Sequence, residues 1–268
     1  MAEHKRSSFG RWQVIKYTLL AWVIAILIWQ GLASFYQNPG LLPSPWQTIQ
    51  GAFELLEDGS LLKFIGISGA RIVTGWALGS LLGVPLGLLM GSLPFFRVLL
   101  EPFINFFRFI PALAFITLFL MWFGVEEQSK VALITYTTLF IVTLNTLMGV
   151  LRVEEEKVRA AKSLGANSWQ VFLYVIVPAT VPSIVNGLRL AMGNSFAAIV
   201  GAEMLAANSG VGYLIWTSRI YFRTDWIFVG LFTLGLMGFV ADKLVASLST
   251  RLLAKYGVAK EASFLRQV

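Results

Sequence analysis

Polar residues that could bind an ion interrupt several otherwise apolar stretches of this chain. They are Arg71, Arg108 with Pro111 close behind it, Asn145, Arg189, Asn194 and Glu203. An arginine stays charged in proteins and offers a planar fork of donors that matches the oxygens of a carboxylate, nitrate or sulfonate group. Because three arginines face only one or two acids in these stretches, we predict that this set of residues lines a path for a small anion.

A structural role is the alternative for the same arginines. Charged side chains inside a membrane are costly, and they tend to face the interior of a helix bundle and to pair there. Arg71 could pair with Glu203 in this way. Arg108 and Arg189 could instead extend along the apolar surface until their charges reach the membrane boundary. The residue types leave both interpretations open.

The sequence has few of the residue types that enzymes use for catalysis. There are no cysteines, and the single histidine is His4 in the N-terminal tail, so we predict no catalytic residue, no metal site and no cofactor held by this chain. A phosphate-binding loop needs a lysine followed by Ser or Thr after spaced glycines. The only such pair is Lys162-Ser163, and no glycine precedes it at that spacing. Any energy from ATP must therefore come from another subunit.

The composition is that of a membrane protein with several spans. Hydrophobic residues make up 57% of the 268 residues and charged residues 13%, with a mean hydropathy of +0.73. A soluble domain has about 45–50% apolar and about 25% charged residues. A membrane-spanning helix needs about 20 mostly apolar residues. Six stretches qualify, at about 17–36, 68–90, 103–123, 131–151, 181–204 and 226–248. The sequence predicts an all-α membrane protein whose six spans form one domain over 17–248.

The distribution of lysine and arginine predicts the orientation of these spans. Fourteen of the 21 basic residues lie in the N-terminal tail, the second and fourth loops and the C-terminal region, whereas four lie on the opposite side. Basic loops stay in the cytoplasm. We therefore expect cytoplasmic tails at 1–16 and 249–268, and we interpret the charge as a topology signal that excludes nucleic-acid binding. The external loop 37–67 contains a short acidic amphipathic stretch, Thr48–Asp58.

Glycines recur every three or four residues in the second predicted span. The segment Gly79–Gly91 reads GSLLGVPLGLLMG. Small residues at this spacing let two helices approach closely in a membrane. We interpret the segment as a helix-packing surface in preference to a moving hinge, with Pro85 permitting a kink.

The fourth loop, 152–178, has the signals of two short helices. A strong helix former runs from Val153 to Leu164, and Gly165 follows as a left-handed helix stop. Asn167 is a good N-cap, with Gln170 in the capping-box position. The alanines at 160 and 161 give the first helix a face that another surface can approach closely. The loop is either an amphipathic connector on the membrane or a docking element for a soluble partner.

A known signature falls on this loop. The pattern Ala160-Ala161-x3-Gly165-x9-Val175-x-Val177-Pro178 resembles the EAA signature of ABC-importer permeases, which lies between the fourth and fifth of six spans in that family. Other segments look like the nitrate/sulfonate/taurine-type branch of the family. They are GVPLGLLMG (83–91), FRFIPALAFITLFLMWFG (107–124), NGLRLAMGNSFAAIVGAEML (186–205) and SGVGYLI (209–215).

The resemblance implies a type I ABC-importer permease fold with a cytoplasmic coupling helix between spans four and five. The residues that would contact a cytoplasmic ATPase are Arg159, Ala160, Ala161, Ser163, Leu164, Gly165 and Ala166, with Arg159 where the family often has Glu. The implied partners are a second copy of the chain, two ATPase subunits that hold ATP and Mg²⁺, a periplasmic or lipid-anchored binding protein, and the lipid of a bacterial inner membrane. The implied cargo is a small anion such as nitrate, an alkanesulfonate or taurine.

A secondary transporter or channel driven by an ion gradient is the alternative function. It needs the same apolar spans and the same polar residues inside them. It gives no reason for the pattern in loop 152–178.

Overall fold

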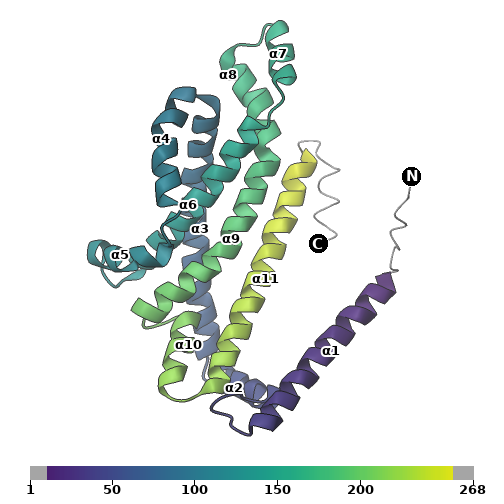
Figure 1. The fold of residues 1–268 in the computed structure, drawn as a ribbon, viewed down its shortest axis with the longest axis vertical. Helices are drawn as coiled ribbons and strands as arrows, with labels where there is room; N and C mark the ends of the chain where they lie inside the picture. The colour runs from purple at the N-terminus through teal and green to yellow at the C-terminus, as the bar shows by residue number, and fades with distance from the viewer. Residues whose placement is uncertain (1–10, 256–268) are drawn as a thin grey trace.

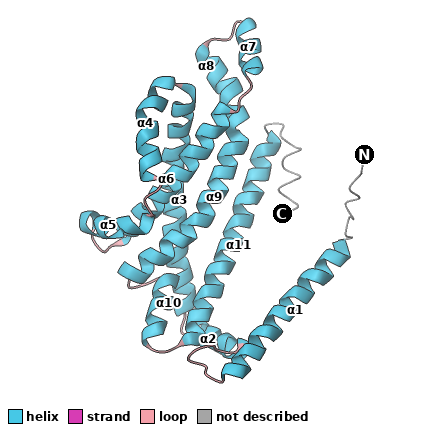
Figure 2. Cartoon of the chain, in the orientation of Figure 1, coloured by secondary structure: helices cyan, strands magenta, loops and turns pink. Residues whose placement is uncertain are grey.

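The structure is a computed structural model that describes residues 11–255, so His4 and the tail ends 1–10 and 256–268 lie outside the described residues. Over 11–255 the chain is helical, with loops and no strand (Figure 2). The α-helices are α1 Arg11–Tyr36, α2 Pro45–Glu57, α3 Ser60–Ser92, α4 Pro94–Phe107, α5 Ile116–Phe123, α6 Glu127–Leu151, α7 Glu155–Ser163, α8 Ser168–Val171, α9 Val177–Ala206, α10 Val211–Ile220 and α11 Thr224–Lys255. A 3₁₀ turn, Ala112–Phe115, precedes α5, and a π-helical turn, Phe172–Ile176, joins α8 to α9.

Five helical segments in the described part of the chain are long and apolar enough to cross a membrane. They are α1, α3, α6, the continuous run from α8 through α9, and α11. A bent pair, α4 with α5, makes a sixth if it is counted as one span. The predicted all-α membrane fold is confirmed.

The third predicted span, 103–123, is not one straight helix. Helix α4 and the segment Ala112–Phe123 meet at an angle of 88°. Pro111 lies at the break, where its ring disfavours a helical conformation for Ile110 and its nitrogen cannot donate a backbone hydrogen bond. Gly124, with a φ of +76°, then ends α5. Two short helices therefore stand where the sequence predicted a single long one.

Helices α3 and α6 form the closest-packed pair of the bundle. Five α3 glycines, one per turn, each face one α6 side chain: Gly75 faces Ile134, Gly79 Thr138, Gly83 Val142, Gly87 Thr146 and Gly91 Val150. A Cβ atom added at Gly79 would lie 2.6 Å from the Thr138 Cβ and 2.7 Å from the Thr135 carbonyl oxygen. The glycine segment is a packing surface, as predicted, and α3 continues through Pro85.

Helix α1 leaves the bundle, and Figure 1 shows it diverging from α11 toward the N-terminus. The C-terminal part of α1 contacts the bundle through Trp29, which stacks on Phe228 of α11 with ring centroids 5.4 Å apart. The Trp29 indole also donates to the Pro43 carbonyl at 2.9 Å. The predicted amphipathic stretch of the first external loop is α2, which begins at Pro45 with a capping box on Ser44.

Candidate functional site

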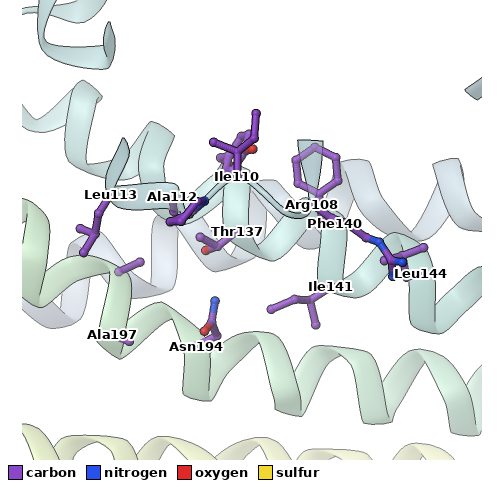
Figure 3. Close-up of a pocket in the computed structure, with 13 residues that line it drawn as sticks. Arg108, Ile110, Ala112, Leu113, Thr137, Phe140, Ile141, Leu144, Asn194 and Ala197 are labelled. Atoms are coloured by element: carbon purple, nitrogen blue, oxygen red, sulfur yellow. The ribbon is translucent and has the colours of Figure 1, made fainter. Parts of the chain in front are cut away.

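A hollow of about 480 Å³ lies at the break between α4 and α5 (Figure 3). Its polar side chains come from three separate segments: Arg108 from the break, where Pro111 also lines the hollow, Tyr136 and Thr137 from α6, and Asn194 from α9. Apolar side chains of the break, of α6 and of α9 complete the wall. The hollow therefore brings together three of the predicted path residues, Arg108, Pro111 and Asn194.

The α6 residues reach the hollow because they share one helix face. Residues 136, 137, 140, 141 and 144 all line it and follow the three-and-four spacing of a helix. The Tyr136 hydroxyl donates to the Phe107 carbonyl at 2.7 Å, and its ring lies 4.7 Å from that of Phe115, centroid to centroid. Tyr136 thus contacts both sides of the break. Figure 3 shows Asn194 pointing from α9 toward Thr137.

Arg108 gives the hollow a positive charge. Its guanidinium carbon lies 4.6 Å from the centroid of the Phe109 ring. Within residues 11–255 no carboxylate lies within ion-pair distance of Arg108. An unpaired guanidinium at the edge of an apolar hollow is suited to attract and orient a small oxyanion.

Arg71 and Glu203 lie in a different place, in a buried ion network. Arg71 donates to Glu203 at 2.7 Å and to both carboxylate oxygens of Glu127 at 2.5 and 2.6 Å. Glu203 also accepts hydrogen bonds of 2.8 Å from the Ser68 hydroxyl and the Gly212 backbone amide. The exposed fraction is 3% for Arg71 and 0% for Glu203. The pairing that the sequence left open is therefore present, and it joins α3, α6, α9 and α10.

The two remaining polar candidates have partners of their own. Arg189 pairs with Asp242 of α11 at 2.9 Å, so its charge has a carboxylate partner on a neighbouring helix. The Asn145 amide donates to the Ile141 carbonyl at 2.8 Å and accepts from Asn186 at 3.3 Å. Neither residue lines the hollow at the break.

The fourth loop projects beyond the ends of the spans, and α7 forms its tip (Figure 1). No residue of α7 is buried. Gly165, with a φ of +87°, ends the helix, its amide donating to the Lys162 carbonyl at 2.9 Å. The Ala166 amide donates to the Ala161 carbonyl at 3.1 Å. This pair of bonds is the Schellman C-cap, which glycine stabilises because it has no Cβ to strain the left-handed conformation.

The second half of the loop is also capped as predicted. Asn167 and Gln170 form a reciprocal capping box, with bonds of 2.8 and 2.9 Å. The chain then passes through the π turn into α9, where Pro178 lies in the first turn and needs no backbone donor. The helix continues through Pro182. The two prolines therefore do not separate loop from span, because one continuous helix runs from Ser168 to Ala206.

Arg159 has a partner on its own helix. It forms an ion pair with Glu155 one turn earlier, and both side chains are more than three-quarters exposed, at 76% and 81%. Leu164 at the tip is 89% exposed. The alanine face, the apolar tip and the charged pair are all accessible to a second molecule.

Sequence reasoning missed several residues around these sites. Tyr136 and Thr137 were not singled out, although the helical period of 131–151 places them on one face with residues 140, 141 and 144. Glu127 and Asp242, the carboxylates that bind Arg71 and Arg189, were missed as well. Glu127 precedes the apolar stretch that marked the fourth span, so hydropathy gave no reason to consider it.

Known proteins resemble this chain over most of its length. Residues 83–255 match the family model described as binding-protein-dependent transport system inner membrane component. A probable ABC transporter permease protein of Brucella melitensis is 36% identical over 87% of this chain and 94% of its own. The taurine transport system permease protein of Escherichia coli is 31% identical over 95% of this chain and 96% of its own.

The fold also has a counterpart among solved structures. A chain of the MetNI methionine ABC transporter, in inward-facing conformations, superposes with a TM-score of 0.57, covering 70% of this chain and 95% of that one. Its sequence identity is 17%, so the likeness concerns the fold alone. Motif, fold and sequence matches agree, and the chain belongs to the family of binding-protein-dependent transport system inner membrane components, the permeases of ABC importers.

Proposed function

We propose that this permease imports a small oxyanion along a path that includes the hollow at the α4–α5 break. The observation that supports the proposal most is the unpaired guanidinium of Arg108 at the edge of that hollow. Relatives at 30–34% identity are named for anionic or zwitterionic cargo: taurine and aliphatic sulfonates in Escherichia coli and nitrate in Synechocystis. Nitrate, alkanesulfonates and taurine all present planar or tetrahedral oxygen groups that arginine can bind.

The proposed transporter contains two copies of this chain, two cytoplasmic ATPase subunits and an external binding protein. ATP and Mg²⁺ lie on the ATPase, because this sequence has no phosphate-binding loop. The permease is a multi-pass protein of the inner membrane, and the basic residues of its tails and of loop 152–178 support cytoplasmic termini. A carrier driven by an ion gradient would leave the exposed, doubly capped loop without a role.

Replacing Arg108 with glutamine tests the path. A hydrogen bond to a charged group is worth about 1.5–3 kcal/mol, so we expect the substrate concentration for half-maximal ATP hydrolysis to rise about tenfold or more. Arg108→Lys keeps the charge but loses the planar fork, and its effect should be intermediate. The measurement is substrate-stimulated ATP hydrolysis by the complex reconstituted with its ATPase and binding protein.

The matched control for this experiment is Arg97→Gln in the first turn of α4, the helix that ends just before Arg108. Arg97 pairs with Glu101 at 3.4 Å, both side chains are partly exposed, and neither lines the hollow. This variant should transport like the unmodified protein. Equal activity of the Arg108→Gln and Arg97→Gln variants would remove Arg108 from the path.

We propose further that loop 152–178 transmits ATPase closure to the spans. Helix α7 contributes no buried residue, so little of its surface is used within the chain. Small residues at 160 and 161 permit close approach by a partner, and the capped elbow at Gly165 and Asn167 keeps α7 and α8 at a fixed angle. The continuous helix from Ser168 to Ala206 carries any movement of the elbow into the membrane, where Asn194 reaches the hollow. The residues proposed to contact the ATPase are Arg159, Ala160, Ala161, Ser163, Leu164, Gly165 and Ala166.

Bulky residues at the elbow should uncouple the transporter. Ala161→Trp places a large ring on the small-residue face, and Gly165→Val forces a β-branched residue into the left-handed region, which costs an ordinary residue about 1–2 kcal/mol. We expect both variants to lose ATPase co-purification and uptake. Gly165→Asn is the control, because asparagine tolerates this conformation. Full association and uptake by the Trp and Val variants would contradict the coupling role.

A further inference from the structure

Helix α2 has three faces of different character. Thr48, Gly51 and Leu55 are buried against the protein. A second set is large, apolar and exposed: Trp46 is 65% exposed, Ile49 46%, Phe53 60% and Leu56 41%. A third set is polar: Gln47, Gln50, Glu54 and Glu57. A helix that met only protein and water would need the first and third faces alone.

The three faces are separate sectors of the helix. At about 100° per residue, the exposed apolar residues cluster on one side, the buried residues about 150° away, and the polar residues in the remaining sector. The apolar stripe follows the spacing three, four, three from Trp46 to Leu56, so it forms one continuous line along the helix. Each sector therefore faces a different environment.

The position of α2 indicates what covers the apolar stripe. The helix lies between the end of span α1 at Tyr36 and the start of span α3 at Ser60, at the end of the bundle opposite α7 (Figure 1). Its buried face packs on the start of span α11, where Gly51 lies against Asp225 and Trp226. Because the helices before and after α2 are both candidate membrane spans, α2 lies at the membrane boundary.

The ends of the two spans next to α2 also expose large apolar side chains. Phe35 in the last turn of α1 is 80% exposed, and Leu62 in the first turn of α3 is 61% exposed. On the polar side, Arg223 forms ion pairs with Glu54 and, at 2.7 Å, with Asp225. The hydrogen bond from Arg223 to Asp225, with a second to Glu54, raises the pKa of Arg223 above its ordinary value. This charged cluster joins the polar face of α2 to the first turn of α11 and belongs to the water side of the boundary.

We propose that α2 is a membrane-surface helix whose stripe Trp46–Ile49–Phe53–Leu56 inserts into the lipid leaflet at the end of the bundle opposite α7. Amphipathic helices with a Trp- and Phe-bearing apolar face bind in the headgroup and upper acyl region of a leaflet. The helix fixes the outer ends of α1, α3 and α11 relative to the lipid surface. This inference depends on the three faces of α2 and is independent of the proposed substrate path.

The cysteine-free sequence permits a direct test with single cysteines. Phe53→Cys and Ile49→Cys place a nitroxide spin label on the stripe, and Gln50→Cys and Glu57→Cys place it on the polar face of the same helix. The full-length protein is reconstituted in vesicles of phosphatidylethanolamine and phosphatidylglycerol. Leu20→Cys on the apolar span α1 and Leu164→Cys at the C-cap of α7 are the lipid and water standards, since these side chains are 53% and 89% exposed. Collision rates with oxygen, which concentrates in lipid, and with a water-soluble nickel chelate are compared at each site.

We expect the stripe positions to resemble residue 20, with oxygen collisions exceeding nickel collisions, and the polar positions to resemble residue 164. Nickel access at residues 49 and 53 equal to that at residue 164 would show that the stripe faces water. Exclusion of both reagents with an immobilised label would show that a second copy of the chain covers it. Either result would overturn the proposal.

Discussion

Replacing Gly79 with alanine is expected to lower the thermal stability of this protein, whereas the same replacement at Gly66 of the same helix is expected to raise it. The new methyl group at residue 79 would lie 2.6 Å from the Thr138 Cβ and 2.7 Å from the Thr135 carbonyl oxygen. Real side chains do not approach so closely, and the carbonyl belongs to helix backbone that cannot rotate away. Helices α3 and α6 must separate, and overpacking of this kind costs about 1–3 kcal/mol, occasionally more.

Gly66 is the matched control because nothing lies within 4 Å of the position a Cβ would take. Alanine is favoured over glycine inside a helix by about 1 kcal/mol, so Gly66→Ala should stabilise. The measurement is thermal unfolding of both variants in the same detergent, followed by loss of the folded peak in size exclusion. Stabilisation by Gly79→Ala, as by Gly66→Ala, would show that the α3–α6 contact is looser than the structure has it.

The α3 side of the α3–α6 contact could be predicted from the sequence. A glycine every fourth residue in a long apolar stretch indicates a helix-packing face, since the signal lies within one helix. The positions on α6 that face these glycines could not be predicted, because Gly79 and Thr138 lie on different helices and no sequence pattern relates them. The presence of the long apolar helices was predictable in the same way, although α3 begins at Ser60 and the run through α9 at Ser168, well before the predicted starts at 68 and 181. Each depends on one continuous run of apolar residues.

The break in the third span could not be predicted from hydropathy. The segment 103–123 is mostly apolar on both sides of the bend, so its average hydropathy over about 20 residues predicts a single membrane-spanning helix. The single local signal was Pro111, and Pro85 and Pro182 show that a proline within an apolar stretch does not always end a helix. The contact that Tyr136 of α6 makes across the bend, a hydrogen bond to the Phe107 carbonyl, joins residues 29 positions apart and has no local signal.

The two candidate sites differ in the same way. Loop 152–178 was predicted in detail, down to the Gly165 stop and the Asn167–Gln170 box, because helix caps involve residues within five positions of one another. The ion network of Arg71 depends on residues 56 and 132 positions away in sequence. The sequence suggested the pair of Arg71 with Glu203 but not the pair of Arg71 with Glu127. Only the packing of α3, α6 and α9 showed that Glu127 completes the set.

Replacing Arg71 with glutamine should be the most damaging single change at a charged residue. Glu203, which is 0% exposed, would keep the Ser68 and Gly212 hydrogen bonds but lose its cation. Removing one partner of a buried ion pair costs about 3–5 kcal/mol, because the remaining charge is left uncompensated. Arg97→Gln is the control, since its i,i+4 pair is partly exposed and such pairs are worth about 0.3–0.5 kcal/mol.

The double variant Arg71→Gln/Glu203→Gln separates a structural role of Arg71 from a role in the path. Neutralising both partners removes the uncompensated charge, so we expect it to recover part of the stability that Arg71→Gln loses, as measured by thermal unfolding. If Arg71 only joins α3, α6 and α9, transport per folded molecule should recover together with stability. If Arg71 also binds the anion, stability should recover while transport stays low. A double variant less stable than Arg71→Gln alone would show that Glu203 does not depend on Arg71 for its burial, and the network would have to be assigned to the Ser68 and Gly212 bonds instead.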